Sequence, residues 1–389
     1  GDVMPKILFK LMVPPMLAVG LLMTVPAYAD GRVVAIGDVH GEYEGLVSIL
    51  ETTGLIDAEL RWIGGDTTLV QTGDLFDRGL EVRKVLDLMM RLQQEAAAAG
   101  GEIVMLYGNH ETMVLTGFYR DVNPDMYATF ADKKTEKIRK NELRAFRDYW
   151  QTQSANEQGV KPPFPDEIRD RWLAAHPLGM IEFQEMLGPN GLYGKWLRTF
   201  QTVALIDGVL FAHGGIGPQL KDMSPQEINA KVADEIATFD RIRTYLLRRG
   251  VVPTTAGLNS LVAASQRLQP PDPKLAALDD VDDWFIISPE GPLWFRGSAS
   301  WSEEERGEEM KAILDGFGAQ AMVNAHTPQA TASIGVRFDG RVFLIDTGML
   351  SSHYGGRASA LVIEDGVFTA VYADGETEVL LDTALADAA

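Results

Sequence analysis

The sequence predicts an α/β fold built on a mostly parallel sheet with crossover helices. Along the first part of the chain, short apolar runs that end near a glycine alternate with longer segments of helical character. Runs that are apolar at every position are typical of strands buried on both faces, and their alternation with helices is typical of parallel sheets. We therefore expect the first strands to lie side by side and to end at one edge of the sheet.

The expected strands are apolar runs bounded by glycine or turn residues: 33–36, 68–71, 103–106, 203–206, 209–212, 321–325, 333–338, 342–346, 360–363 and 367–372. The expected helices are longer and amphipathic or charged: 43–52, 80–98, 133–150, 165–175, 177–187, 192–197 and 225–248. Asp339-Gly340 and Asp365-Gly366 are two-residue hairpin signals between neighbouring strands.

The order of these elements predicts one main domain, residues 30–373. Residues 115–198 interrupt it with charged helical segments and no evident strand, which indicates a helical insertion or cap. Residues 269–283 are rich in proline and aspartate and are expected to form a surface loop. Residues 374–389 are acidic and rich in small side chains, so we expect a flexible tail.

The N-terminal residues 1–29 have the pattern of a signal peptide. Lys6 and Lys10 precede a charge-free segment, residues 11–26, and small residues at Ala27 and Ala29 follow it. The apolar segment is short for a membrane span and contains prolines. We therefore expect cleavage after Ala29, a periplasmic or secreted protein, and no stable membrane insertion after cleavage.

Composition excludes several functions. The formal net charge of −20 argues against nucleic-acid binding, which depends on neutralisation of phosphates by Lys and Arg. The 389 residues include no cysteine, so a cysteinyl-phosphate mechanism, zinc–thiolate sites and iron–sulfur clusters are excluded. A phosphorylated substrate would have to be attracted by a local positive site, such as a metal centre.

Candidate metal ligands follow three successive predicted strands. The motifs are GDVHG at residues 37–41, GDLFDRG at 73–79 and GNHE at 108–111. Because sites in open α/β sheets form at the carboxyl ends of strands, the three loops are expected to lie together. Each loop alone is also compatible with a tight turn and a helix cap, but three in register favour a metal site.

Two further histidines directly follow apolar strands. They are His213, in HGG at residues 213–215, and His326, in AHTP at residues 325–328. His176 lies in a helical segment and is interpreted as structural. His353 lies near the segment DTGM at residues 346–349, which we interpret as a possible rim of the site, and its role is left open.

These motifs resemble those of the phosphoprotein phosphatase branch of the calcineurin-like metallophosphoesterases. That pattern is GDxHG, GDxxDRG, GNHE, a later HGG and a final histidine, and all five occur here in order. WFRG at residues 294–297 and DTGM at 346–349 make the chain most similar to the bacterial Shewanella-like protein phosphatases. The resemblance implies a β-sandwich flanked by helices.

The resemblance also implies roles for individual residues. Asp38, His40 and Asp74 would hold one metal ion. A second ion would share Asp74 and would also be held by three further ligands, Asn109, His213 and His326. This mixture of imidazole and oxygen ligands suits Mn, Fe or Zn better than Ca or Mg.

The same resemblance assigns the groups that act on the substrate. Arg78, Arg296 and Asn109 would bind the phosphate, since a guanidinium group can pair with two phosphate oxygens. His110 would protonate the leaving group and Asp77 would orient His110. Glu111 and Gly79 are interpreted as structural.

The expected function is hydrolysis of phosphomonoesters by direct in-line attack of a hydroxide that bridges two divalent ions. The expected substrate is a phosphorylated protein, on tyrosine and/or on serine and threonine, or a small phosphomonoester. Hydrolysis of nucleotides or dinucleoside polyphosphates is an alternative on the same scaffold, and a phosphodiesterase is less favoured because paired arginines suit a dianionic phosphate. A non-catalytic phosphoprotein-binding module is the alternative from another class.

Overall fold

The computed structural model describes residues 31–383. The predicted signal peptide, residues 1–29, lies outside this range, and so does the end of the predicted tail. No helix within residues 31–383 is both long enough and apolar enough to cross a membrane.

Two mixed sheets form the centre of the molecule. The first has the order β11-β10-β9-β1-β2-β3, and its strands are β1 (Val33–Ile36), β2 (Thr68–Gln71), β3 (Glu102–Met105), β9 (Ser359–Glu364), β10 (Val367–Tyr372) and β11 (Thr377–Asp382). The second has the order β4-β5-β6-β8-β7, and its strands are β4 (Val203–Ile206), β5 (Val209–Ala212), β6 (Ala321–Asn324), β7 (Gly335–Arg337) and β8 (Val342–Leu344).

The parallel pairing is confined to the centres of the two sheets. Strands β1, β2 and β3 are parallel, as are β5, β6 and β8, whereas the remaining strands pair antiparallel. The mostly parallel sheet predicted from the alternation of strands and helices is therefore found only at these central strands. The sandwich flanked by helices that the family resemblance implied is confirmed.

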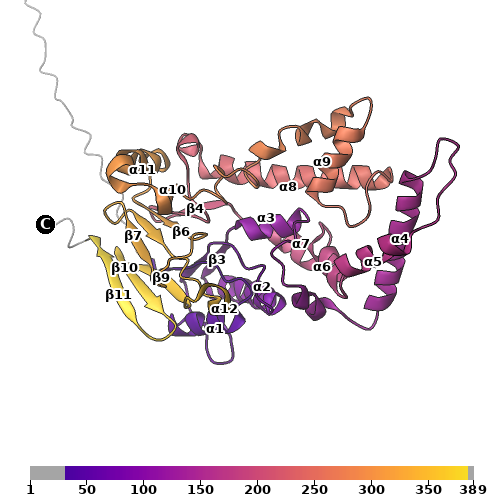
Figure 1. The fold of residues 1–389 in the computed structure, drawn as a ribbon. Coiled ribbons are helices and arrows are strands. Elements are labelled where there is room, and N and C mark those ends of the chain that lie inside the picture. Colours follow the sequence, from indigo (N-terminus) through magenta and orange to yellow (C-terminus); the bar gives the residue numbers. More distant parts are fainter. Residues whose placement is uncertain (1–30, 384–389) are drawn as a thin grey trace, which may run out of the picture.

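The sequences of the central strands are continuously apolar because both faces of these strands are buried. In β1, Val33 and Ala35 face the interior of the sandwich, while Val34 and Ile36 face the covering helices. Helices α1 (Tyr43–Thr52) and α2 (Val82–Ala99) pack on the outer face of the first sheet. Helix α11 (Glu303–Phe317) packs on the outer face of the second. Four layers result, helix, sheet, sheet and helix (Figure 1).

The interior of the sandwich supports a stability prediction. Phe343 of β8 and Phe368 of β10 are fully buried, and their rings stack with centroids 4.5 Å apart. Phe343→Ala is expected to lower the free energy of unfolding by about 3–5 kcal/mol, because it opens a cavity between the sheets. Val336→Ala on the edge strand β7, where the side chain is 38% exposed, is the control and should stay within about 0.5 kcal/mol. Urea unfolding measures both variants, and equal midpoints would contradict the prediction.

A body of helices extends from the carboxyl ends of the strands to one side of the sandwich (Figure 1). Its members come from two blocks of sequence: α3 (Asn109–Leu115), η1 (Pro124–Phe130), α4 (Thr135–Gln153), α5 (Asp166–Ala175), α6 (Met180–Leu187), α7 (Leu192–Leu197), α8 (Pro225–Arg248) and α9 (Leu258–Arg267). The two blocks are joined by hydrogen bonds from Tyr149 Oη to the Val251 carbonyl and from Gln153 Nε2 to the Gly250 carbonyl. The segment predicted as an insertion therefore packs with the second helical block.

Short helices complete the fold: η2 (Pro218–Leu220), η3 (Pro273–Leu278), η4 (Val281–Asp283), α10 (Gly297–Ser300) and α12 (Ser351–Tyr354). Residues 269–283 were predicted as a plain surface loop. They contain η3 and η4, and Leu275 and Leu278 are buried in the core of the helical body. The proline and aspartate content of this segment predicted a surface loop, and the two buried leucines were therefore not recognised as core residues.

The predicted flexible tail at residues 374–389 is wrong for its first part. Residues Thr377–Asp382 form β11, which pairs antiparallel with β10. Leu380 and Leu381 are partly buried against the sandwich core, which explains why this acidic segment is ordered as a strand. Residues 384–389 lie outside the described range.

Candidate metal centre

Five loops meet at the carboxyl ends of the central strands of both sheets. They follow β1, β2 and β3 in the first sheet and β5 and β6 in the second. The residues predicted from sequence as metal ligands lie in these loops or, for Asn109, at the first position of α3, and are at most 5% exposed: Asp38, His40, Asp74, Asn109, His213 and His326. Residues spread across almost three hundred positions of sequence thus converge on one buried locus.

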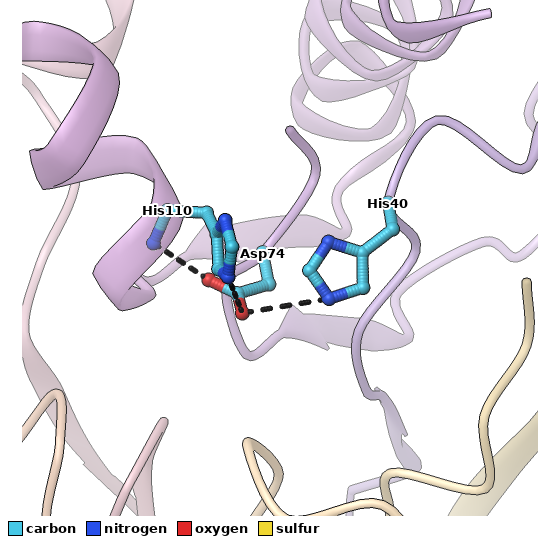
Figure 2. Close-up of side chains that lie close together, drawn as sticks. All are labelled: His40, Asp74 and His110. Atoms are coloured by element: carbon cyan, nitrogen blue, oxygen red, sulfur yellow. Dashed lines mark hydrogen bonds and ion pairs between the residues drawn. The ribbon is translucent and has the colours of Figure 1, made fainter. Parts of the chain in front are cut away.

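Asp74 lies at the centre of this locus. Its Oδ2 atom is 3.7 Å from His40 Nε2, 3.8 Å from His110 Nε2 and 3.3 Å from His213 Nε2. Figure 2 shows Asp74 between His40 and His110, with both rings directed at its carboxylate. Burial opposes ionisation of Asp74, but the surrounding histidines hold the pKa of its carboxyl well below its usual range. The centre of the site is therefore an anion.

Two groups of side chains around Asp74 have spacings compatible with metal binding. His40, Asp74 and His110 form one, and Asp74, His213 and His326 form the other, with the ligand atoms of each group within 4.8 Å of one another. Asp74 belongs to both, as expected for a bridging ligand. The first group contains His110, which was predicted as an acid, in place of Asp38. Asp38 lies beside it, with Oδ2 3.7 Å from His40 Nε2.

Hydrogen bonds to backbone carbonyls fix the orientation of two histidines. Nδ1 of His40 donates to the Phe76 carbonyl at 2.7 Å, and Nδ1 of His213 donates to the Thr72 carbonyl at 2.9 Å. In both rings, Nε2 then faces the carboxylate of Asp74. Burial lowers the pKa of His40 to about 3, so this ring is neutral at physiological pH. Metal-binding histidines are oriented in this way by an outer hydrogen bond.

Acceptor atoms crowd together around the second group. His213 Nε2 lies 3.0 Å from Asn109 Oδ1 and 3.3 Å from Asp74 Oδ2, although neither oxygen can donate a proton to it. His326 Nε2 is buried and has no hydrogen-bond partner within residues 31–383, and burial lowers the pKa of this ring to about 2. A buried ring nitrogen without a partner is destabilising unless another group, such as a cation, satisfies it. The donor set therefore fits a divalent metal ion with mixed nitrogen and oxygen ligands.

The neighbouring carboxylates of Asp38 and Asp346 also favour a cation at this site. Burial and the neighbouring carboxylates of Asp346 and Asp74 raise the pKa of Asp38 well above its usual range. Asp346 follows β8 and is itself 1% exposed. The sequence indicated only a rim near residues 346–349, whereas the structure places this carboxylate inside the site, next to Asp38.

Glu111 connects two of the loops. Its carboxylate accepts backbone N–H bonds from Asp74 at 2.8 Å, Leu75 at 2.7 Å and Gly108 at 2.7 Å. The loop after β2 is thereby held against the start of α3, next to the central Asp74. A side chain at Gly108 would collide there, since its Cβ would lie 2.1 Å from Asp74 Oδ1.

Glu111→Ala is expected to lower the free energy of unfolding by about 3 kcal/mol or more, since each buried donor left unpaired costs about 1–3 kcal/mol. It should also weaken metal binding, because Asp74 loses its backbone support. Denaturant unfolding and bound-metal analysis measure the two effects. Glu51→Ala at an exposed position of α1 is the control, and a Glu111→Ala protein as stable as this control would contradict the structural role.

Backbone conformation at the site is unusual. Five of the eleven non-glycine residues with positive φ within residues 31–383 lie in these loops: His40, Asp74, Asp77, Arg78 and His326. Such conformations cost of order 1–3 kcal/mol each and persist only where surrounding contacts enforce them. Their clustering indicates loops held in a fixed, preorganised arrangement.

A cavity of about 260 Å³ opens onto Asp38, Asp74 and His326, and two arginines predicted to bind phosphate line it. Arg78 lies with Nη1 3.0 Å from His40 Nε2 and is hydrogen-bonded to the Tyr354 hydroxyl. Arg296 Nη1 donates to the His326 carbonyl at 3.1 Å and to Thr327 Oγ1 at 2.9 Å. The cavity therefore combines a ligand-rich floor with guanidinium groups in its walls.

His110 also lines this cavity and is paired with Asp77. Its Nδ1 donates to Asp77 Oδ2 at 2.6 Å, while Nε2 faces Asp74. Burial opposes protonation, but the carboxylates of Asp74 and Asp77 raise the pKa of His110 above its ordinary value. The geometry fits both a proton donor and a metal ligand.

Three residues of the cavity wall were not predicted from the sequence: Tyr354, Arg120 and Asp121. Tyr354 stacks on His40 with ring centroids 5.6 Å apart. In the sequence, only its position next to His353 could have indicated that it belongs to the site. The ring of His353 contacts Tyr354 at a centroid distance of 4.6 Å. His176 lies at the end of α5, stacked on Trp172 with centroids 4.1 Å apart, in a side-chain environment separate from these loops.

The comparisons with known proteins agree with this architecture. A family model described as calcineurin-like phosphoesterase matches residues 31–330. Shewanella-like protein phosphatase 1 of Plasmodium berghei (strain Anka) is 27% identical over 333 residues, which cover 84% of this chain and 69% of the relative. Shewanella-like protein phosphatase 2 of Arabidopsis thaliana is 32% identical over 215 residues, or 54% of this chain and 52% of the relative.

Solved structures agree as well. A cold-active protein tyrosine phosphatase superimposes with a TM-score of 0.62 and 26% identity, covering 93% of this chain and 82% of the other. A second structure, of the cold-active protein-tyrosine phosphatase of a psychrophilic Shewanella species, has a TM-score of 0.60, 26% identity and coverage of 92% and 83%. The predicted family is confirmed, and the chain belongs to the calcineurin-like phosphoesterases, metal-dependent hydrolases that act on phosphorylated substrates.

Proposed function

We propose that this chain is a two-metal phosphomonoesterase that dephosphorylates proteins. The observation that carries the proposal is the position of Asp74, shared by two histidine-containing groups on the floor of a cavity whose walls contain Arg78 and Arg296. Asp38, His40, Asp74, Asn109, His213 and His326 are proposed to hold two divalent ions, with Mn, Fe and Zn as the candidate metals. The relatives named as protein phosphatases support a phosphoprotein substrate.

Bound divalent ions would supply a nucleophile by lowering the pKa of a water molecule, and would polarise a phosphoryl oxygen for direct in-line attack. The side chains of the cavity would do the rest. Arg78 and Arg296 are suited to pair with the oxygens of a terminal phosphate, and Asn109 can donate through its amide. His110, oriented by its 2.6 Å bond to Asp77, would deliver a proton to the leaving oxygen.

Side-by-side kinetics test the proposal. We expect Mn²⁺-supplemented enzyme to hydrolyse a phosphotyrosine or a phosphoserine peptide with a higher kcat/KM than a dinucleoside polyphosphate or a phosphodiester. The phosphotyrosine peptide is expected to be the better of the two peptides, by analogy with the tyrosine phosphatases that share the fold. Preferred hydrolysis of the dinucleoside polyphosphate would favour the nucleotide alternative, and absence of any turnover would favour a binding module.

The paired arginines give a second test of the same proposal. Arg296→Ala should reduce kcat/KM for the monoester peptide by about a hundredfold, since charge-assisted hydrogen bonds to a buried anion are worth about 1.5–3 kcal/mol. It should affect a phosphodiester much less, because a diester carries one negative charge fewer. Arg341→Ala, remote from the cavity lining, serves as the control, and an equal loss on both substrates would argue against monoester selectivity.

A further inference from the structure

A larger hollow of about 790 Å³ adjoins the candidate metal centre. It shares Trp294 and Arg296 with the 260 Å³ cavity, so the two spaces meet across these side chains. We call it the tryptophan hollow and define it by its largest apolar side chains, Ile287, Trp294, Phe295 and Trp301. Its lining includes Gly297 and Ser300 of α10 and Arg306 near the start of α11.

The wall of the tryptophan hollow is fixed to the metal-site loops. The backbone N–H groups of Gly214 and Gly215, directly after His213, both donate to the Pro292 carbonyl, at 2.9 and 3.2 Å. Trp294 Nε1 donates to the Ile286 carbonyl at 3.0 Å. A binding surface held in this way needs little ordering when a ligand enters, which favours affinity.

Close packing around Gly297 also fixes the aromatic side chains. Phe295 and Trp301 meet edge to face with ring centroids 5.3 Å apart. A Cβ atom at Gly297 would lie 2.2 Å from the Phe295 ring and 2.6 Å from the Trp301 ring, so no side chain fits between them. The hollow is therefore preformed.

Several polar groups that line the hollow already have partners within the protein. Gln219 Nε2 donates to the Glu290 carbonyl, and Ser300 Oγ donates to the Arg296 carbonyl at 2.9 Å. Arg306 is paired with Glu309 and lies over the Trp301 ring, 5.3 Å from its centroid. The apolar and aromatic side chains of the wall gain free energy when an apolar group covers them.

We propose that the tryptophan hollow binds an aromatic or long aliphatic side chain of the substrate protein, close in sequence to the phosphorylated residue. Trp294 and Arg296 line both spaces and so place the hollow beside the cavity proposed to bind the phosphate, which ties the occupant to the substrate. The volume lies within the range of about 300–1,000 Å³ that is typical of ligand pockets, enough for a side chain and its adjoining backbone. This inference rests on the proposed function as a protein phosphatase.

The test uses one phosphotyrosine peptide in which each of the four positions on either side carries Phe, Leu or Ala in turn. The wild-type enzyme is expected to show a position at which Phe or Leu raises kcat/KM about tenfold over Ala, the order expected for an apolar pocket. Ile287→Ala and Trp301→Ala should each remove most of that preference. Hydrolysis of para-nitrophenyl phosphate should change less than twofold, since neither side chain lines the smaller cavity.

Ile63→Ala is the matched control for Ile287→Ala. Ile63 is 56% exposed and precedes the amino end of β2, opposite the strand ends that carry the site. Peptides hydrolysed without any preference for an apolar neighbour would overturn this inference alone, as would variants that slow para-nitrophenyl phosphate by the same factor as the peptide. Hydrolysis of para-nitrophenyl phosphate without hydrolysis of any peptide would overturn the protein-phosphatase proposal, and this inference with it.

Discussion

Asp74→Asn is expected to lower kcat by at least about a thousandfold, because metal ions contribute several kcal/mol of transition-state stabilisation and each 1.4 kcal/mol is tenfold in rate. Asp74 Oδ2 lies within 3.3–3.8 Å of Nε2 atoms of three histidines, and Asp74 belongs to both candidate metal-binding groups. The amide removes the central negative charge and one shared ligand without changing the size of the side chain. Elemental analysis of the purified variant should therefore show reduced metal content.

Thermal unfolding gives a readout that does not depend on turnover. A ligand that binds only the folded state stabilises it in proportion to the logarithm of its concentration. Added Mn²⁺ should raise the Tm of the wild type and of the control Asp148→Asn, whose carboxylate is 65% exposed on α4. It should raise the Tm of Asp74→Asn much less. Full turnover and an unchanged response to Mn²⁺ in Asp74→Asn would contradict the placement of the metal centre.

His110→Asn is the second variant with a large expected effect. If His110 acts as the acid, kcat should fall by about 10²–10⁴-fold, the usual contribution of general acid catalysis. The loss should be greatest for substrates with poor leaving groups, such as phosphoserine peptides, and smallest for para-nitrophenyl phosphate. Metal content should remain that of the wild type. Stopped assays with the two substrates and elemental analysis measure these outcomes.

This variant separates the two roles that the geometry allows. His110 Nδ1 is bonded to Asp77, as an oriented acid would be, yet His110 Nε2 also belongs to a group that could hold a metal. Loss of metal together with a rate loss independent of the leaving group would show a ligand, and would contradict the acid role. Asp77→Asn is the companion variant, and it should give a smaller loss that follows the same dependence on leaving group.

The parts of the structure that could be predicted from sequence are the strands and loops whose pattern of apolar residues and glycines lies within a short segment. Val33–Ile36 is apolar at every position because helices cover one face of β1 and the second sheet covers the other. The loops after β1, β2 and β3 could be placed together because parallel neighbours end at the same edge. Glycine positions marked the ends of the runs, so the strand and loop boundaries were close to those observed.

The pairing of distant strands could not be predicted from the local pattern. β1 pairs antiparallel with β9, more than three hundred residues away, and that pairing turns the expected parallel sheet into a mixed one. The apolar pattern reports burial and not the direction of the neighbouring strand. The strand β11 was missed for a related reason, since its partly buried leucines are embedded in an acidic segment.

Site residues outside the motifs were not predicted because only tertiary packing places them at the cavity. Tyr354 reaches the cavity from α12, and Arg120 reaches it from the segment after α3, without any periodic or spacing signal. Asp346 is adjacent to Asp38 because the ends of β8 and β1, from different sheets, approach closely: a Cβ at Gly37 would lie 2.8 Å from the Ile345 carbonyl. Export stays a prediction, since it rests on residues 1–29, and N-terminal sequencing of the exported protein would test it.

Two metal ions at Asp74 are proposed to drive hydrolysis of a phosphoprotein. The most direct test strips the purified enzyme with a chelator, titrates Mn²⁺ back and follows both bound metal and release of phosphate from a phosphotyrosine peptide. We expect no turnover in the stripped enzyme, and recovery that reaches its plateau at two bound ions per chain. Undiminished hydrolysis by the metal-free enzyme, or full recovery with a single bound ion, would contradict the account.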